Sequence, residues 1–235
     1  MKVILNVAMT IDGKIDSVAR QGASISSDDD WERVDRLRAA QDAIIVGGRT
    51  LLDDDPRLLV KSATLRAERV AAGFSPDPVK VGIISEATLS VNSRFMTVGA
   101  APIVIFTSQR TSETQLTTLR DEGAQVYVLG ETRVNLATAL KTLAEQGIEN
   151  VMVEGGGSLN AALLAKGLIN EVQVYIAPLI FGGATAPTLA DGEGILAGIK
   201  LDLVSVEKRG GGGVLLKYRV TGQEFSDPGI LFDIK

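Results

Sequence analysis

The residues best suited to chemistry are Glu154 and the three glycines after it, which lead from an apolar run into a helix-forming segment. Glycines between a strand and a helix let the backbone approach a ligand closely, and the helix N-terminus adds free N–H groups and the positive end of its dipole. This pattern suits a phosphate group. Taken alone, three glycines are more typical of an ordinary tight turn. Glu154 favours a ligand-binding site over a simple turn, because a carboxylate at the end of a buried strand has little structural purpose.

A second glycine pair, at 47–48, follows another apolar run and leads into the segment RTLLDDDPRL at 49–58. Thr50 is placed to cap a short helix there. Three aspartates at 53–55 crowd negative charge into one turn. Taken alone, this pattern is typical of a solvated acidic turn closed by a proline, and a metal site would need further ligands.

Asn6 interrupts an otherwise apolar run near the N-terminus, where a buried amide needs hydrogen-bond partners. The dipeptide of Asp12 and Gly13 then favours a turn before Lys14. A last glycine pair, at 182–183, ends another apolar run and is as typical of a chain reversal as of a ligand site. None of these patterns decides a function by itself.

The chain has 235 residues and contains no cysteine and no histidine. These absences exclude disulfides, thiol nucleophiles, Ser-His-Asp catalysis and metal sites built from cysteine or histidine. The formal net charge of −5 disfavours a nucleic-acid partner. No apolar run approaches the roughly 18 residues of a membrane span, and the N-terminus lacks a signal-peptide pattern. We therefore expect a cytoplasmic protein that binds neither metal nor membrane.

Short runs rich in valine and isoleucine, bounded by polar residues or glycine, predict strands. They lie at 3–9, 43–47, 79–85, 103–107, 125–129, 150–153 and 172–177. Helical patterns between them lie at 28–40, 112–122, 135–146 and 159–166. Such alternation indicates an α/β fold with a mostly parallel sheet. The last two runs, at 203–208 and 214–220, predict a closing antiparallel hairpin.

The ends of the helices carry their own signals. Ser26 or Ser27 is expected to cap the first helix, while Gly147 and Gly167 are expected to end the third and fourth. The segment 63–78 has helical character followed by prolines, which is typical of a surface insertion. We therefore expect residues 1–222 to form a single domain and residues 223–235 to form a C-terminal tail.

Together, and in this order, the motifs resemble one family. The segments that carry the resemblance are NVAMTIDGKI, RAAQDAIIVGGRTLLDDDPRL, VEGGGSLN, NEVQVYIAPLIFGG and APTLADGEG. They are similar to the archaeal and fungal 2,5-diamino-6-ribosylamino-pyrimidinone 5′-phosphate reductases and, more distantly, to the reductase domain of bacterial bifunctional deaminase-reductases of riboflavin synthesis. The resemblance implies a dihydrofolate-reductase-like three-layer sandwich, a phosphorylated pyrimidine substrate, a homodimer and NADPH as cofactor, with NADH as the alternative.

The resemblance also implies roles for particular residues. It assigns the cofactor to Thr50, Asp54, Ser85, Gly155, Gly156, Gly157 and Ser158, and the substrate to Asn6, Ser26, Arg38, Leu58, Lys61 and Glu154. Asp54, Glu154 and Asn6 are expected beside the reacting atoms. Two positions depart from the family pattern, since Lys61 replaces an arginine found in many members and Ser85 replaces the usual aspartate. A lysine meets phosphate as a point charge rather than as a bidentate fork.

The implied reaction is hydride transfer from the cofactor to C1′ of the opened ribosylamine. Without histidine, the candidates for proton transfer are Asp54, Glu154 and Lys14, with bound water as an equal alternative. Residues 107–110, which follow a predicted strand, are candidates for contact with the cofactor's 2′-phosphate.

The substrate depends on the order of two steps, because bacterial enzymes deaminate before reduction and archaeal and fungal enzymes reduce first. The chain lacks ligands for a zinc deaminase, and Asn6 is the residue that the archaeal type carries where bacterial members usually have lysine. We therefore expect the undeaminated 2,5-diamino substrate. The alternatives are a 5-amino-6-(5-phosphoribosylamino)uracil reductase, a dihydrofolate reductase-like enzyme, or a non-catalytic nucleotide-binding protein.

Overall fold

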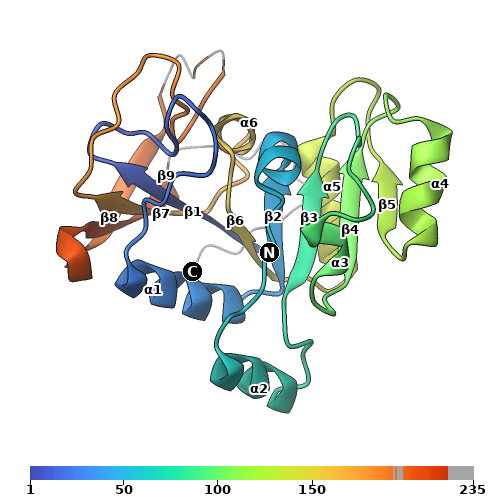
Figure 1. The fold of residues 1–235 in the computed structure, drawn as a ribbon, viewed down its shortest axis with the longest axis horizontal. Coiled ribbons are helices and arrows are strands. Elements are labelled where there is room, and N and C mark those ends of the chain that lie inside the picture. The colour runs from blue at the N-terminus through green and yellow to red at the C-terminus, as the bar shows by residue number, and fades with distance from the viewer. Residues whose placement is uncertain (193, 195–197, 222–235) are drawn as a thin grey trace. The chain divides into compact units, whose positions relative to one another are not determined.

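The computed structural model describes residues 1–192, 194 and 198–221, so the expected tail at 223–235 lies outside the described residues. The chain divides into two compact units (Figure 1). Unit 1 combines Met1–Val34 with Met152–Lys235, and unit 2 is the continuous segment Asp35–Val151. The expectation of a single domain for residues 1–222 stays a prediction.

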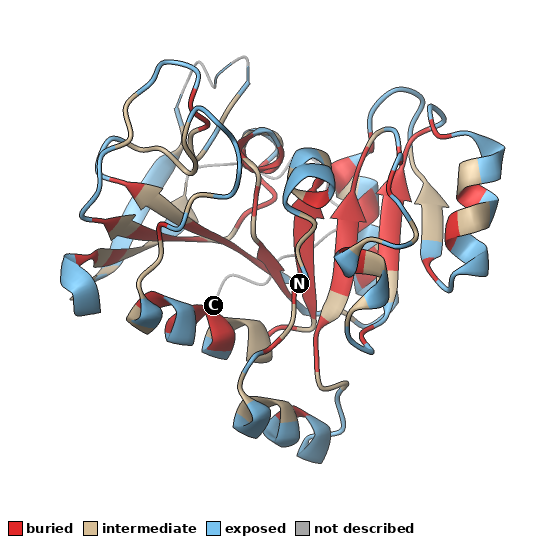
Figure 2. Ribbon diagram, in the orientation of Figure 1, coloured by how far each residue is buried: buried red, intermediate tan, exposed pale blue. Residues whose placement is uncertain are grey.

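Unit 2 contains four parallel strands in the spatial order β2, β3, β4 and β5. Their bounds are Ala43–Gly47, Val79–Ile83, Ile103–Thr107 and Gln125–Val128. The helices of this unit are α2 (Ala63–Ala71), α3 (Arg94–Thr97), α4 (Glu113–Asp121) and α5 (Leu136–Glu145). Figure 2 shows β2, β3 and β4 buried along most of their length, as expected for parallel strands that are covered on both faces.

Unit 1 contains a mixed sheet in which β1 is parallel to β7, and β9 is antiparallel to both β7 and β8. Their bounds are Lys2–Thr10 for β1, Glu171–Ala177 for β7, Lys200–Lys208 for β8 and Val214–Thr221 for β9. Helix α6 (Gly157–Ala165) follows β6 (Asn150–Val153), which lies next to β1 in the sheet. The expected α/β fold, mostly parallel with an antiparallel C-terminal hairpin, is confirmed.

Most expected helix ends are confirmed. Ser27, and not Ser26, caps α1 (Asp28–Ala39), because its Oγ accepts a hydrogen bond of 3.3 Å from the Asp30 N–H. Gly147 and Gly167 stand just past α5 and α6 with φ of +82° and +67°. The prediction that Thr50 caps a helix is wrong. The chain is already helical at Arg49, so Thr50 is the first residue of the short π-helix Thr50–Asp54.

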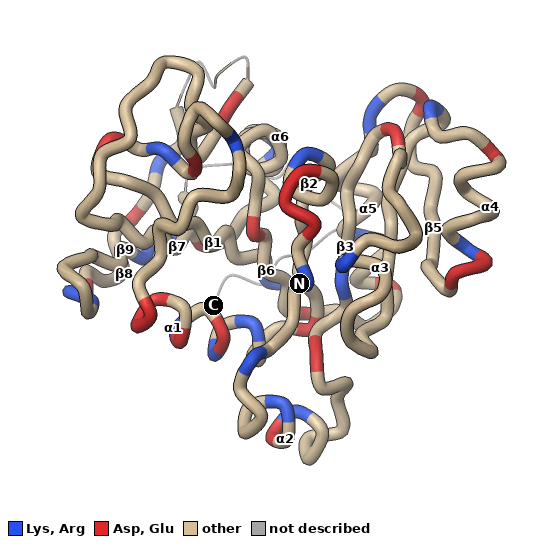
Figure 3. Tube along the Cα trace, in the orientation of Figure 1, with Lys and Arg blue, Asp and Glu red and all other residues tan. Residues whose placement is uncertain are grey.

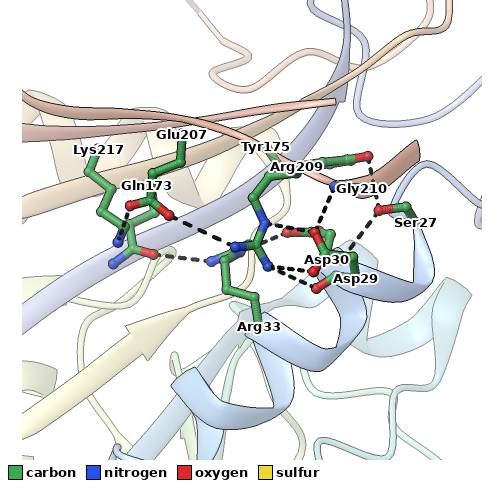
Figure 4. A network of polar contacts seen from close by, with 10 residues as sticks. All are labelled: Ser27, Asp29, Asp30, Arg33, Gln173, Tyr175, Glu207, Arg209, Gly210 and Lys217. Atoms are coloured by element: carbon green, nitrogen blue, oxygen red, sulfur yellow. Dashed lines mark hydrogen bonds and ion pairs between the residues drawn. The ribbon is translucent and has the colours of Figure 1, made fainter. Parts of the chain in front are cut away.

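The turn of the β8–β9 hairpin packs on the start of α1 (Figure 4). Asp29 accepts hydrogen bonds from Arg209 Nη2 at 3.0 Å and from the Gly210 N–H at 2.9 Å. The Tyr175 hydroxyl lies 3.1 Å from Ser27 Oγ. Gly213 has room only for hydrogen, since a Cβ would lie 2.4 Å from the Tyr175 ring. Close packing therefore explains Gly213, whereas Gly211 and Gly212 have positive φ angles of 77° and 84°.

No helix among the described residues is long and apolar enough to cross a membrane. Across residues 1–192, 194 and 198–221 the acidic side chains also form no cluster of three that could hold a metal ion.

Candidate active site

The glycine loop, residues 155–157, connects β6 to α6 in the strand–loop–helix order that the sequence predicts. Gly155 has φ of +103°, a conformation that L side chains rarely adopt. A Cβ placed on Gly155 would lie 3.9 Å from Asn160 Nδ2, an ordinary contact distance, so the positive φ and not a close contact favours glycine there. Gly157 is different, because a Cβ there would lie 2.4 Å from the carbonyl oxygen of Thr188. Glycine is therefore required at 155 by backbone conformation and at 157 by a close contact.

Asn6 lies in the middle of β1 and is 8% exposed. Its Oδ1 atom is buried and has no hydrogen-bond partner among the described residues. The neighbouring Gln173 on β7 accepts from Arg33 Nη1 at 3.1 Å and donates from Nε2 to Glu171 Oε1 at 2.7 Å, and not to Asn6 (Figure 4 draws the Arg33 bond). An unpaired buried acceptor is costly, and a donor on a ligand would remove that cost.

Glu154 directly follows β6, the strand next to the one that carries Asn6. It is partly buried and engaged in the fold. Ser26, also in unit 1, precedes the capping residue Ser27, which Tyr175 holds in place. Three of the expected substrate contacts are thus provided by unit 1.

The other three expected substrate contacts lie together in unit 2. Arg38, near the end of α1, donates from Nη1 to the carbonyl oxygen of Leu59 at 2.9 Å. Leu58 is buried with φ of +51°, and Lys61 is exposed three residues later. The sequence separates Arg38 from Lys61 by more than twenty residues, and the fold brings the Arg38 side chain to the backbone that precedes Lys61.

Asp35 completes this arrangement and was not predicted from the sequence. Its buried carboxylate accepts hydrogen bonds from the N–H groups of Lys61 at 2.5 Å and Ser62 at 2.8 Å. Asp77 Oδ1 holds the Val60 N–H at 2.9 Å. The available signal was an acidic residue one helical turn before Arg38, on the same face of α1.

The acidic turn after β2, residues 53–55, is not simply solvated, because one of its carboxylates and its backbone contact α3. Figure 3 marks its acidic positions as a continuous red segment of the trace near β2. The Asp55 carboxylate accepts from the N–H groups of Arg94 at 2.8 Å and Phe95 at 2.9 Å, and so holds the start of α3. The Asp54 carbonyl oxygen accepts from Arg94 Nη2 at 2.6 Å. These contacts fix the backbone that carries the expected cofactor residues Thr50 and Asp54.

Ser85 follows β3, and its carbonyl oxygen binds the residues after β4. It accepts from the Ser108 N–H at 3.3 Å and from Ser108 Oγ at 2.5 Å. Arg110, in the same segment, pairs with Glu86 at 2.5 Å on the surface. Ser85 and the candidate 2′-phosphate segment 107–110 therefore lie at the same carboxyl edge of the unit 2 sheet.

Asp12 joins the turn after β1 to the loop after β7. Its Oδ1 accepts from Thr10 Oγ1 at 2.6 Å, and its Oδ2 accepts from the Gly182 N–H at 2.7 Å. The pKa of this exposed carboxyl is lowered, first by the Thr10 hydroxyl and then by the backbone N–H groups of Gly182 and Phe181, although desolvation opposes them. Lys14 Nζ lies 3.5 Å from the carbonyl oxygen of Ala186, so the structure ties it to the loop that follows β7.

Comparison with known proteins finds relatives over most of the chain. The model of the RibD C-terminal domain matches residues 1–215. A protein of Methanothermobacter thermautotrophicus named 2,5-diamino-6-ribosylamino-4(3H)-pyrimidinone 5′-phosphate reductase is 45% identical over 193 residues, covering 82% of this chain and 85% of that protein. A protein of the same name from Archaeoglobus fulgidus is 39% identical over 202 residues, covering 86% and 91%.

A solved structure agrees with the fold. The pyrimidine reductase-like protein of Corynebacterium diphtheriae has a TM-score of 0.80 and covers 94% of this chain and 92% of its own, at 19% identity. At that identity the likeness shows the fold alone. The sequence matches show more, because the family model extends over every expected site residue in both units. The resemblance inferred from the motifs is confirmed, and the chain belongs to the RibD C-terminal domain family.

Proposed function

We propose that this protein reduces the ribosylamino group of 2,5-diamino-6-ribosylamino-4(3H)-pyrimidinone 5′-phosphate to the ribitylamino form, with NADPH as hydride donor. Two archaeal relatives that carry the name of this reductase support the activity. The observation in this chain that supports it best is the buried, unpartnered Oδ1 of Asn6. The other proposed contacts are the glycine loop for the cofactor and Arg38 with Lys61 for the 5′-phosphate.

Asn6 favours the undeaminated pyrimidine. An amide oxygen without a partner accepts hydrogen bonds, and a ring amino group donates them. The deaminated uracil substrate carries a carbonyl where the diamino substrate carries an amino group, so an acceptor would face an acceptor. A mismatch of this kind costs about 1–3 kcal/mol at a buried position. We therefore place reduction before deamination.

The glycine loop fits a nicotinamide dinucleotide. The N-terminus of α6, which follows the glycine loop, suits a pyrophosphate, which lacks hydrogen-bond donors and carries negative charge. When bound, the cofactor supplies the hydride. The proposed part of Thr50, Asp54, Ser85, Gly156 and Ser158 is to hold and orient it.

The reaction requires little proton transfer by side chains of this protein. The substrate must open to an imine, which presents an electrophilic C1′. Glu154 is proposed to orient the pyrimidine amino groups or the ribityl hydroxyls, which are donors suited to a carboxylate. Alignment of donor and acceptor carbons to about 3–3.5 Å is then the main contribution of the protein.

We also propose a homodimer through the edge strand β8. This strand pairs with β9 alone among the described strands, and it exposes Leu201, Leu203 and Val206 by 41%, 55% and 58%. A long, apolar sheet edge is a common association surface. Light scattering of the purified protein tests this, and a monomer would contradict it. A cytoplasmic location and the absence of a nucleic-acid partner also stay predictions.

The test of the activity is an absorbance assay at the NADPH band. We expect oxidation only when the 2,5-diamino substrate is present, with much slower turnover of the uracil analogue. Parallel reactions with NADH and with dihydrofolate measure cofactor choice and the dihydrofolate reductase alternative. Binding of NADPH without turnover of either pyrimidine would favour the non-catalytic alternative and contradict the proposal.

A further inference from the structure

The segment 186–191, called the strap here, packs against the glycine loop. The Asp191 N–H donates to the carbonyl oxygen of Gly157 at 3.0 Å. A Cβ on Gly157 would lie 2.4 Å from the Thr188 oxygen and 2.8 Å from Asp191 Oδ2. The φ angle of Gly157 is not positive, so this glycine is required by contact and not by backbone conformation. The strap therefore occupies one side of the loop and leaves no room for a side chain there.

The strap is itself fixed in place. Asp191 Oδ1 accepts from both the N–H and the hydroxyl of Thr188, at 3.0 and 2.7 Å. On the other side, Thr188 forms a β-bridge with Lys14, and the Ile15 N–H donates to Pro187 at 2.9 Å. The strap thus connects the turn after β1 to the start of α6, and all of these residues belong to unit 1.

Asn160 is the buried link between the strap and α6. It is fully buried, and its Nδ2 donates to the carbonyl oxygen of Leu189 at 2.8 Å. Its Oδ1 has no hydrogen-bond partner among the described residues, and it lies 4.0 Å from where a Cβ of Gly155 would stand. An apolar residue of similar size would avoid the cost of this unpaired oxygen. The amide is therefore explained by the position that it gives to Leu189 and not by stability alone.

We infer that the strap determines the conformation of the glycine loop, and that Asn160 and Asp191 are positioning residues for binding of the dinucleotide cofactor. Neither side chain needs to touch the cofactor. Asn160 holds the strap from inside α6, and Asp191 holds Thr188 and, through its backbone, Gly157. This inference rests on the proposed binding of NADPH at the glycine loop.

Substitutions at Asn160 and Asp191 test whether their hydrogen bonds, and not only the volume of their side chains, hold the strap. Asn160→Asp keeps the size of the side chain but removes the N–H that binds Leu189. Asp191→Ala removes the acceptor for Thr188, whereas Asp191→Asn keeps Oδ1 and is the conservative partner. Ile169→Val is the control, because Ile169 is a buried residue after α6 that lies outside both the strap and the glycine loop.

The measurements are NADPH titration, KM for the pyrimidine, and amide hydrogen exchange of residues 155–160 without cofactor. We expect Asn160→Asp and Asp191→Ala to raise the NADPH Kd at least tenfold and to speed exchange in the loop, with the pyrimidine KM within about twofold of wild type. Asp191→Asn should keep wild-type affinity, and Ile169→Val should change only the melting temperature.

The outcomes distinguish the two proposals. A wild-type protein that does not bind NADPH contradicts the proposed function. A wild-type protein that binds NADPH, with unchanged affinity and loop exchange in both Asn160→Asp and Asp191→Ala, overturns the role of the strap alone. Asp191 is only partly buried, so the comparison of its alanine and asparagine variants decides the question even if Asn160→Asp fails to fold.

Discussion

Asp35 offers the sharpest test of phosphate recognition, because it acts on Lys61 through the backbone. In Asp35→Asn, one carboxylate oxygen becomes an NH₂ group, so one of the two hydrogen bonds to Lys61 and Ser62 is lost and a donor faces a donor. A hydrogen bond to a charged group contributes about 1.5–3 kcal/mol when buried. Lys61 is exposed and water can replace part of this, so we expect a loss of roughly 1–2 kcal/mol of stability.

This loss should appear in substrate binding as well as in stability. A displacement of Lys61 that removes about 1.4 kcal/mol of its interaction with the 5′-phosphate raises KM about tenfold. The NADPH Kd should be unchanged. The assay compares steady-state KM for the phosphorylated substrate and its dephosphorylated analogue, and we expect the two values to converge in the variant.

A matched control is available in the same unit. Asp42 also accepts two consecutive backbone N–H groups, those of Glu149 at 2.9 Å and Asn150 at 2.7 Å, at the amino end of β6. Both N–H groups bind the same oxygen, Oδ2, which the amide oxygen of an asparagine can replace, so Asp42→Asn should lower the melting temperature less than Asp35→Asn and leave KM unchanged. If Asp35→Asn and Asp42→Asn change KM equally, or if the dephosphorylated analogue loses as much as the substrate, Asp35 has no specific role at the phosphate.

Three further predictions concern the glycine loop, Glu154 and Asp12. Gly156→Val should abolish NADPH binding in a folded protein because a β-branched side chain fills the space for pyrophosphate, and a titration that matches wild type would place the cofactor elsewhere. Glu154→Gln should raise KM with a modest fall in kcat and an unchanged pH profile, whereas a kcat loss on the order of a hundredfold together with loss of one limb would indicate proton transfer instead. Asp12→Asn should lower stability at neutral pH. Because folding lowers the pKa of Asp12, its contribution is present above the unfolded pKa and disappears as the pH falls through the folded one. The difference in melting temperature between wild type and Asp12→Asn should therefore shrink on acidification, and a constant difference would argue against this linkage.

Local patterns predicted the elements well because their signals are local. Runs of valine and isoleucine bounded by glycine located the strands, and Gly147 marked a helix end through its positive φ. Thr50 was misjudged because the chain is already helical at Arg49, and no local residue pattern marks that start.

Contacts between distant segments could not be predicted in the same way. The bond from Asn160 to Leu189 spans 29 residues, and the bonds from Asp35 to Lys61 and Ser62 span 26 and 27. In each bond the partner of the Asn160 or Asp35 side chain is an ordinary backbone group, which carries no sequence signal. Gly157 looked like a phosphate contact for the same reason, since the Thr188 oxygen that excludes its side chain is also part of the backbone.

The division of the chain has a consequence for synthesis on the ribosome. Unit 2 is continuous, so all of its strands are available once residue 151 has emerged. Unit 1 combines segments from both ends of the chain. The hydrogen bond between Ser27 and Tyr175 can form only after 148 further residues have been made, and that between Asp29 and Arg209 only after 180. We therefore expect unit 2 to gain protease resistance on nascent chains first, while the apolar strand β1 stays available to chaperones until β7 and the C-terminal hairpin have been made.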